Sequence, residues 1–436
     1  MIKISEAFLH HVWKLQWFNT THLKTNRGET LEIIHPGTHN HHAGPDFLNA
    51  RIRIDDTLWW GNVEIHVHAS DWLRHNHQDD DKYKNIILHV VLYNDTEIFL
   101  HVPGDLPLFN LSNAMNNSIW ETYHAWLNNY HWIPCEKTIH SIEPIIWHNS
   151  SDRLQLDRLE ERVKRIIDRL KRNSGDWTQV AFMELCMSFG FKSNTLAMEM
   201  LSSSIPFPLI ARHQSDPLQI DALLFGQAGL LPAHAHDDYT RALVNEYTIL
   251  KHKHALRSLS PTIWNFGKVR PANSPVLRIA QLSAVLSQSN HLVSSLLHLQ
   301  HHELLAWLKG TTHPYWKLHK NFGMKRSAAL ETSLGKASTE QIIINVACKI
   351  RFAFGKYHND YRMMENALRL LHSLSPEHNS ITAKWASMNI RCENAGDSQA
   401  LIQLYNVYCT QERCFKCPMG ISLLQKQNHE THSQPA

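Results

Sequence analysis

The 436-residue sequence has no apolar run that approaches the about 20 residues needed for a membrane-spanning helix. Its first residues, MIKISEAFLHHVWKLQWF, are interrupted by His, Lys and Glu, so they lack the apolar core of a secretory signal. The chain also has little net charge, because 43 Lys and Arg residues oppose 40 Asp and Glu residues. This near balance excludes a protein that binds nucleic acid by charge alone. We expect a globular, cytoplasmic protein with no membrane partner.

Cysteine is also scarce and odd in number, with seven residues. In a cytoplasmic chain, such a count argues against a framework of disulfides. Cys135, Cys186 and Cys348 stand far apart in apolar segments. We predict that these three residues are buried, inert thiols.

The other four cysteines crowd near the C-terminus in a C-x16-C-x4-C-x2-C pattern. Four thiolates suit a structural Zn²⁺ or an iron–sulfur cluster. The C-x4-C-x2-C part has the spacing of plant-type ferredoxins, whereas a single C-x-x-C pair is common in zinc sites, so both metals stay open. The alternative is a group of reduced thiols packed at a helix end. The predicted metal ligands are Cys392, Cys409, Cys414 and Cys417.

Histidine, by contrast, is abundant, with 33 residues. Because histidine titrates near pH ~6.5, mild acid would make the chain strongly basic. A single site uses only a few of these side chains, so most of them must lie on the surface or take part in packing. The histidines of interest are those that share a face with other metal-ligating residues.

The first hundred residues have the periodicity of an α/β core. Apolar residues on one side indicate a helix over residues 5–18. The segments NARIRID and WWGNVEIHVH meet at an Asp-Asp turn and predict a β-hairpin. The run NIILHVVLY is apolar throughout, which is typical of a strand buried on both faces. Strands over 31–34 and 97–102 and a short helix over 70–77 complete the prediction.

Beyond residue 112 the strand patterns nearly vanish and helical patterns follow one another. The segment 152–172 has the pattern of an amphipathic helix with charge pairs. We therefore predict an α+β protein with a mostly α-helical C-terminal domain. The expected boundaries are 1–112 for the α/β core, 113–390 for the helical domain, 391–424 for a Cys-rich metal-binding segment and 425–436 for a disordered tail.

Two acidic residues of the hairpin region could meet at one cation. Asp46 follows Gly44 and Pro45, and Glu64 lies on the next predicted strand, two residues before His66. Because side chains alternate along a strand, Glu64 and His66 share one face. Carboxylates are hard oxygen ligands that suit Mg²⁺ or Mn²⁺, and such an ion can activate water and stabilise charge on a phosphate.

This order of elements and acidic residues resembles the PD-(D/E)-x-K nuclease-like superfamily. The resemblance implies a restriction-endonuclease-like core and a metal-dependent nuclease that hydrolyses phosphodiester bonds in DNA or RNA. It places Asp46 and Glu64 on the two acidic positions that hold Mg²⁺ or Mn²⁺, and Glu6 or Glu32 could supply a further carboxylate. The lysine of the superfamily is replaced by His66, which could act as general base, metal ligand or cationic stabiliser. Lys82 or Lys84 of the following loop could take the place of that lysine.

Two other functions stay open. The missing lysine fits a non-catalytic module that binds nucleic acid or protein on an inherited nuclease-like fold. A mixed set of histidines and carboxylates instead fits a metalloenzyme with a non-phosphate substrate, and it would favour Mn²⁺, Zn²⁺ or Fe over Mg²⁺. The histidines that could join Asp46 and Glu64 in this site are His66, His75, His77 and His89.

A wider resemblance covers nearly the whole chain. The segments GPDFLNARIRID, GNVEIHVHASDW and RHNHQDDDKYKNIILHVV are similar to the signature of a bacterial family of unknown function. LLFGQAGLL, RPANSPVLRIAQL and the C-terminal cysteines are similar to its later landmarks. The resemblance places the following residues on motif positions of that family: Asp46, Asn49, Glu64, His66, Asp71, His75, His77 and His89.

Overall fold

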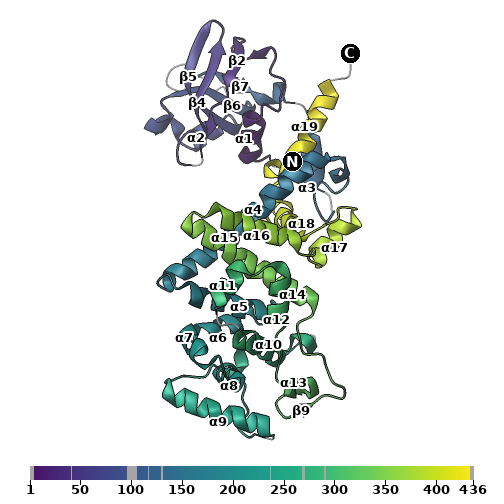
Figure 1. Ribbon diagram of the computed structural model, residues 1–436. Helices are drawn as coiled ribbons and strands as arrows, with labels where there is room; N and C mark the ends of the chain where they lie inside the picture. Colours follow the sequence, from purple (N-terminus) through teal and green to yellow (C-terminus); the bar gives the residue numbers. More distant parts are fainter. Residues whose placement is uncertain are drawn as a thin grey trace. The chain divides into compact units, whose positions relative to one another are not determined.

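The computed structural model describes residues 4–40, 42–95, 106–115, 117–128, 131–235, 237–267, 271–288 and 291–432. The chain forms two compact units (Figure 1). The first unit combines Met1–Ser150 with Tyr405–Ala436, and the second consists of Ser151–Leu404. The first unit is therefore larger than the α/β core predicted for residues 1–112, because the C-terminal segment returns to it.

A mixed sheet with its helices occupies the N-terminal part of the first unit (Figure 1). The predicted hairpin and the buried strand after it are confirmed as β4, β5 and β6. The strand predicted over 97–102 lies outside the described residues. The elements are α1 (Glu6–Lys14), β1 (Leu23–Lys24), β2 (Thr30–His35), β3 (Thr38–His39), β4 (Phe47–Ile54), β5 (Thr57–His68), α2 (Asp71–Arg74), β6 (Ile86–Tyr93) and β7 (Leu108–Asn110).

The strands of this sheet run in the order β1-β2-β4-β5-β6-β7, and β3 pairs with β4. The pairs from β1 to β5 are antiparallel, whereas β6 lies parallel to β5 and β7 parallel to β6. Glu64 of β5 is in register with His89 of β6. Paired residues of neighbouring strands point to the same face, so these two side chains share one side of the sheet.

The pairing of β4 with β5 contains a β-bulge beside Asp46. Phe47 pairs with Val63 and Ala50 with Gly61, so β4 has one extra residue between the two pairs. Asn49 lies in this bulge with φ +58°, a left-handed conformation that asparagine tolerates better than most residues. Its backbone N–H donates to the Asn62 side chain at 3.2 Å.

The C-terminal segment completes the first unit. A π-helical turn (Leu404–Cys409) leads to the 3₁₀ turn η9 (Cys414–Lys416) and to α19 (Pro418–His432). The helix α19 thus extends beyond residue 425, where the sequence predicts the start of a disordered tail. The other elements of this part are α3 (Asn117–Leu127), η5 (Ile139–Ser141) and the start of α4 (Pro144–Arg172).

The second unit is helical and is built around one large apolar core (Figure 1). None of the helices among the described residues is long and apolar enough to cross a membrane. A two-stranded sheet, β8 (His319–Asn321) with β9 (Met324–Lys325), is its one small β element in the described part. After α4 the helices are α5 (Trp177–Phe189), α6 (Thr195–Ser203), α7 (Phe207–His213), α8 (Pro217–Gln227), α9 (Asp238–Lys253), α10 (Pro275–Ser287), α11 (Leu292–His298), α12 (His301–Lys309), α13 (Tyr315–Leu318), α14 (Lys336–Asn345), α15 (Ala347–His358), α16 (Tyr361–Ser373), α17 (Ser380–Ser387) and α18 (Ala395–Gln403).

A buried carboxyl group in this core makes stability depend on pH. Asp221 of α8 is 6% exposed and accepts a hydrogen bond from the Tyr239 hydroxyl at 2.8 Å. Burial raises the pKa of Asp221 to about 6, against about 3.9 in an unfolded chain. The stability from this group is therefore fully present below pH ~4 and lost as the pH rises through about 6.

Asp221→Asn is accordingly expected to raise the free energy of unfolding by about 2–3 kcal/mol at pH 7.5, and to change it little at pH 4. Urea denaturation of both proteins at the two pH values measures this difference. Asp238→Asn is the control, because the Asp238 side chain is 98% exposed. An equal effect of Asp221→Asn at both pH values would contradict the assignment.

Candidate metal centre

A group of carboxylates and histidines gathers at one face of the mixed sheet. Glu64 and His66 point from β5, and Asp46 stands directly before β4. His75 ends α2, and His77 begins the following 3₁₀ turn. We call these five residues the histidine–carboxylate cluster.

The two carboxylates of the cluster are immediate neighbours. The backbone N–H of Asp46 donates to Glu64 Oε2 at 3.0 Å. In return, the backbone N–H of Ile65 donates to Asp46 Oδ2 at 3.0 Å. These reciprocal bonds hold the acidic residues of adjacent strands together.

Three histidines lie around Glu64. One ring nitrogen from each of His66, His75 and His77 lies within 4.8 Å of the other two. Nε2 of His77 is 3.2 Å from Glu64 Oε1, and Nε2 of His66 is 3.6 Å from the same oxygen. The ring of His77 stacks on Tyr83 with the centroids 3.9 Å apart, which orients the imidazole.

A further histidine, His10, which is not among the predicted site residues, joins the cluster from α1. Nε2 of His10 is 3.2 Å from Asp46 Oδ2. Glu6 lies one helical turn earlier on the same helix, half-buried, and its pKa is raised by burial while His75 and His10 oppose the shift. The spacing i, i+4 places Glu6 and His10 on one face of α1, but it does not indicate that this face lies beside Asp46.

His66 contacts a second buried histidine, His89, on the neighbouring strand. Its Nδ1 lies 2.9 Å from Nε2 of His89, which is 3% exposed on β6. Burial, with neighbouring histidines, lowers the pKa of His66 to about 2, and burial lowers that of His89 to about 3. Both imidazoles are therefore neutral at pH 7, so one ring donates and the other accepts. Such a partner fixes the tautomer and orientation of a ligating histidine.

The surroundings of Glu64 disfavour the ionised form of its carboxyl group. Glu64 is 4% exposed, and burial raises its pKa above the ordinary value. The contact with His77 opposes this shift, and the charge of Asp46 adds to it. Two neighbouring carboxylates in a buried site are stabilised by a cation between them.

The contact between His77 and Glu64 also fits a cation. Nε2 of His77 is buried and has no partner in hydrogen-bonding geometry, although Glu64 Oε1 lies 3.2 Å away. Two ligands of one ion come this close without bonding to each other, since metal–ligand bonds of about 2.1 Å at right angles separate the ligands by about 3 Å. The donor set therefore fits a bound divalent metal.

Asn49 and Asp71, predicted to support the site, shape the backbone near it. Asn49 is exposed and occupies the bulge of β4. Asp71 is 2% exposed, and its Oδ2 accepts the backbone N–H of His68 at 3.1 Å, while its Oδ1 pairs with Arg74 at 2.6 Å. Asp71 thus fixes the turn from β5 into α2, which carries His75.

The predicted cysteine ligands fall into different units. Cys392 belongs to the second unit, where Asp397 and Glu377 are the charged neighbours of its thiol. Cys409, Cys414 and Cys417 belong to the first unit.

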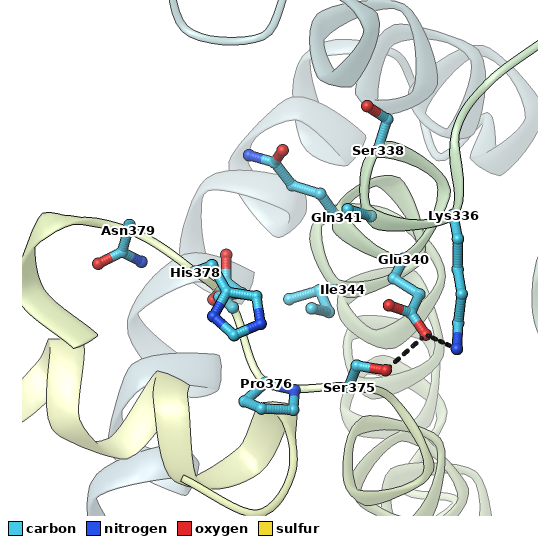
Figure 2. A pocket seen from close by; sticks show the side chains of 11 residues that line it. Lys336, Ser338, Glu340, Gln341, Ile344, Ser375, Pro376, His378 and Asn379 are labelled. Carbon is cyan, nitrogen blue, oxygen red and sulfur yellow. Dashed lines mark hydrogen bonds and ion pairs between the residues drawn. The ribbon is translucent and has the colours of Figure 1, made fainter. Parts of the chain in front are cut away.

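The second unit contains a cavity of about 430 Å³ between α14 and the loop that precedes α17 (Figure 2). Two carboxylates, Glu340 and Glu377, belong to its lining. Glu340 accepts a hydrogen bond from Ser375 at 3.0 Å and pairs with Lys336 at 3.9 Å. His378 is the one histidine of the lining. This cavity has no set of converging metal ligands comparable to the histidine–carboxylate cluster.

Comparisons with known proteins identify the family. The model of a family described as "Protein of unknown function (DUF2851)" matches residues 6–380. A search of curated proteins found no significant match, and a search of solved structures found none either. The matched region contains the whole histidine–carboxylate cluster and most of the helical unit. The chain therefore belongs to the DUF2851 family of proteins of unknown function.

Proposed function

We propose that the first unit is a metal-dependent phosphodiesterase that hydrolyses DNA or RNA. The observation that carries this proposal is the convergence of two adjacent carboxylates and three histidines on one face of the sheet. The strand order supports it: the antiparallel strands β2, β4 and β5, then α2, then the parallel strand β6, follow the order of the nuclease-like core that the sequence resembles.

The ion would be held by Glu64 and by ring nitrogens of His66, His75 and His77, with Asp46 beside them. A mixed set of imidazoles and carboxylates favours Mn²⁺, Zn²⁺ or Fe²⁺ over Mg²⁺, which prefers oxygen ligands. When bound, such an ion would activate a water molecule and stabilise negative charge on the phosphate.

The residues of the chain take separate roles. His66 has a pKa near 2 and uses Nδ1 for its bond to His89, so it serves as a ligand and not as a base. His10 is oriented by Asp46 and lies partly exposed at the edge of the cluster. We assign to His10 the acceptance of a proton from the attacking water, with Asp46 stabilising the imidazolium that forms.

A second candidate is a metalloenzyme with a non-phosphate substrate. The three-histidine group favours it, since a donor set rich in imidazoles suits Zn²⁺ or Fe²⁺, and His66 stands where the nuclease-like superfamily has its lysine. The two candidates share the metal centre and differ in the bond that is cleaved.

The test is a cleavage assay on purified protein with single-stranded DNA, double-stranded DNA, RNA and a model phosphodiester. Cleavage is expected with Mn²⁺ and is expected to stop on chelation. Asp46→Asn should abolish it, whereas Asp56→Asn, an exposed change in the β4–β5 turn, should leave it unchanged. Tight, stoichiometric Zn²⁺ or Fe²⁺ binding without cleavage of any of these substrates would overturn the nuclease and favour the second candidate.

A further inference from the structure

We propose that Cys135, Cys409, Cys414 and Cys417 bind an iron–sulfur cluster that joins the C-terminal segment to the turn around Cys135. The inference does not depend on the histidine–carboxylate cluster or on its activity. It replaces Cys392, the ligand that the sequence spacing predicts, with Cys135, which the sequence predicts to be inert.

Side-chain contacts hold two segments that are distant in sequence against each other. The rings of Trp132 and Tyr405 stack with the centroids 4.5 Å apart and the planes at 15°. Nζ of Lys426 on α19 donates to the carbonyl of Ser141 at 2.9 Å. Cys135 lies between Trp132 and Ser141, and its carbonyl accepts the N–H of Ile139 at 2.9 Å. The turn around Cys135 is therefore fixed beside the segment that carries the other three cysteines.

The C-terminal cysteines lie on a tightly wound chain. Cys409 ends the π-helical turn, and Cys417 donates its backbone N–H to Arg413 at 3.0 Å before α19 begins. Gly420 in the first turn of α19 is packed onto Cys414, since a Cβ at this position would lie 2.1 Å from the Cys414 carbonyl oxygen. The glycine therefore lets the helix approach the cysteine turn more closely than any other residue would.

The four thiols share one buried environment. Cys135, Cys414 and Cys417 are less than a tenth exposed, and none of the four forms a disulfide. Burial raises the pKa of the Cys409 thiol, and the charges of Cys417, Cys135 and Cys414 raise it further. The thiol of Cys135 is likewise influenced first by burial and then by Cys417 and Cys414. Each thiol thus lies within electrostatic range of others in the group.

Backbone groups already support one thiolate. The backbone N–H groups of Met419 and Gly420 donate hydrogen bonds to the Cys417 sulfur. Donors of this kind stabilise metal-bound thiolates and tune the bound centre. Without a metal, four buried thiolates would repel one another, and a cation removes that repulsion and takes the thiols in deprotonated form.

The remaining cysteines lie in other surroundings. Cys186 and Cys348 are fully buried within the apolar core of the second unit. Cys392 also belongs to the second unit, beside Asp397 and Glu377. Acidic neighbours disfavour a thiolate, so these surroundings do not prepare Cys392 as a ligand.

The spacing of the sulfurs favours a cluster over a single ion. A tetrahedral Zn²⁺ with Zn–S bonds of about 2.3 Å would bring its four sulfurs within about 3.8 Å of one another. Among the described residues, no three of these sulfurs lie within 4.8 Å of one another. An iron–sulfur cluster places each thiolate on a different iron or a different side of the cluster, and so accepts wider spacing.

The experiment is anaerobic purification of the full chain, followed by visible spectroscopy and by iron, sulfide and zinc analysis. The expected protein is brown, with iron and acid-labile sulfide and no stoichiometric zinc. Cys135→Ser is expected to lower the iron content by at least about half, and the matched control Cys392→Ser is expected to retain the wild-type content and spectrum.

Two further measurements keep the result decisive. Cys409→Ser alters the least buried member of the group and should lose iron even if Cys135→Ser fails to fold. Wild-type protein without iron, or with stoichiometric zinc instead, overturns the iron–sulfur assignment. Full iron in folded Cys135→Ser together with loss in Cys392→Ser overturns the ligand set.

Discussion

Glu64→Gln is expected to lower metal-dependent cleavage by about 100-fold or more, because it removes a charged ligand from the centre of the cluster. The glutamine keeps the size of the side chain and an oxygen that can accept the Asp46 N–H. It loses the negative charge that faces His77 at 3.2 Å and His66 at 3.6 Å. The assay is cleavage rate against Mn²⁺ concentration, with metal affinity measured by calorimetry.

The same substitution is expected to leave the metal-free fold intact or to stabilise it. Glu64 is buried beside Asp46, and its pKa lies above the ordinary value. Its negative charge therefore destabilises the folded state when no cation is bound. Thermal unfolding with a chelator present therefore separates a ligand from a merely structural residue. A folded Glu64→Gln protein that keeps wild-type metal affinity and rate would disprove the metal centre.

Glu32→Gln is the matched control for this change. Glu32 lies on β2 of the same sheet, 57% exposed, with its carboxylate 2.6 Å from Arg53. Loss of an exposed pair changes stability by at most about 1 kcal/mol. No effect on metal affinity or cleavage is expected from it.

Glu184→Gln is expected to lower the free energy of unfolding by about 3–5 kcal/mol, because it leaves a buried cation without its counter-charge. Glu184 of α5 has a side chain that is 2% exposed, and it accepts a hydrogen bond from Lys349 of α15 at 2.8 Å. It also pairs with Arg169 of α4. Three helices of the second unit are thus joined by one carboxylate. Chemical denaturation at pH 7 measures the loss.

An exposed ion pair with the same N–O distance supplies the control. Lys356 and Glu160 also meet at 2.8 Å, but their side chains are 44% and 43% exposed. Glu160→Gln is expected to cost no more than about 1 kcal/mol, since water already solvates both charges. Equal costs for the two substitutions would show that burial does not strengthen the Glu184 pair.

The Glu184 network also has a pH dependence of known sign. Burial by itself would raise the pKa of Glu184, but Lys349 and Arg169 together hold it below the ordinary value. Its contribution is therefore present above the unfolded pKa of about 4.3, and it is lost as the pH falls through the lower folded value. In Glu184→Gln this acid sensitivity should be reduced.

Local pattern was sufficient for much of the sheet region. The alternation of Val63, Glu64, Ile65 and His66 predicts a half-apolar strand, and the structure contains it as β5. The unbroken apolar run of β6 predicts a strand covered on both faces, and six of its eight residues are buried. Periodicity indicates local structure because side chains alternate between two faces along a strand and return to one face about every 3.6 residues along a helix.

Asp46 and Glu64 could be proposed as neighbours from sequence because one hairpin connects their strands. His10 could not, since its approach to Asp46 depends on how α1 packs against the sheet. The burial of His66 against His89 likewise depends on the parallel register of β5 and β6, which no local period encodes.

The cysteines show most clearly what the sequence determines and what the tertiary structure determines. The sequence by itself determined that three thiols near the C-terminus lie close together, because short spacings leave the chain no freedom to separate them. Only the tertiary structure points to Cys135 as the proposed fourth, because it lies more than 270 residues before Cys409 and belongs to the same unit, whereas Cys392 does not. A contact across such a loop is set by the packing of buried surfaces and by backbone hydrogen bonds, which are properties of the folded chain and leave no periodic trace in the sequence.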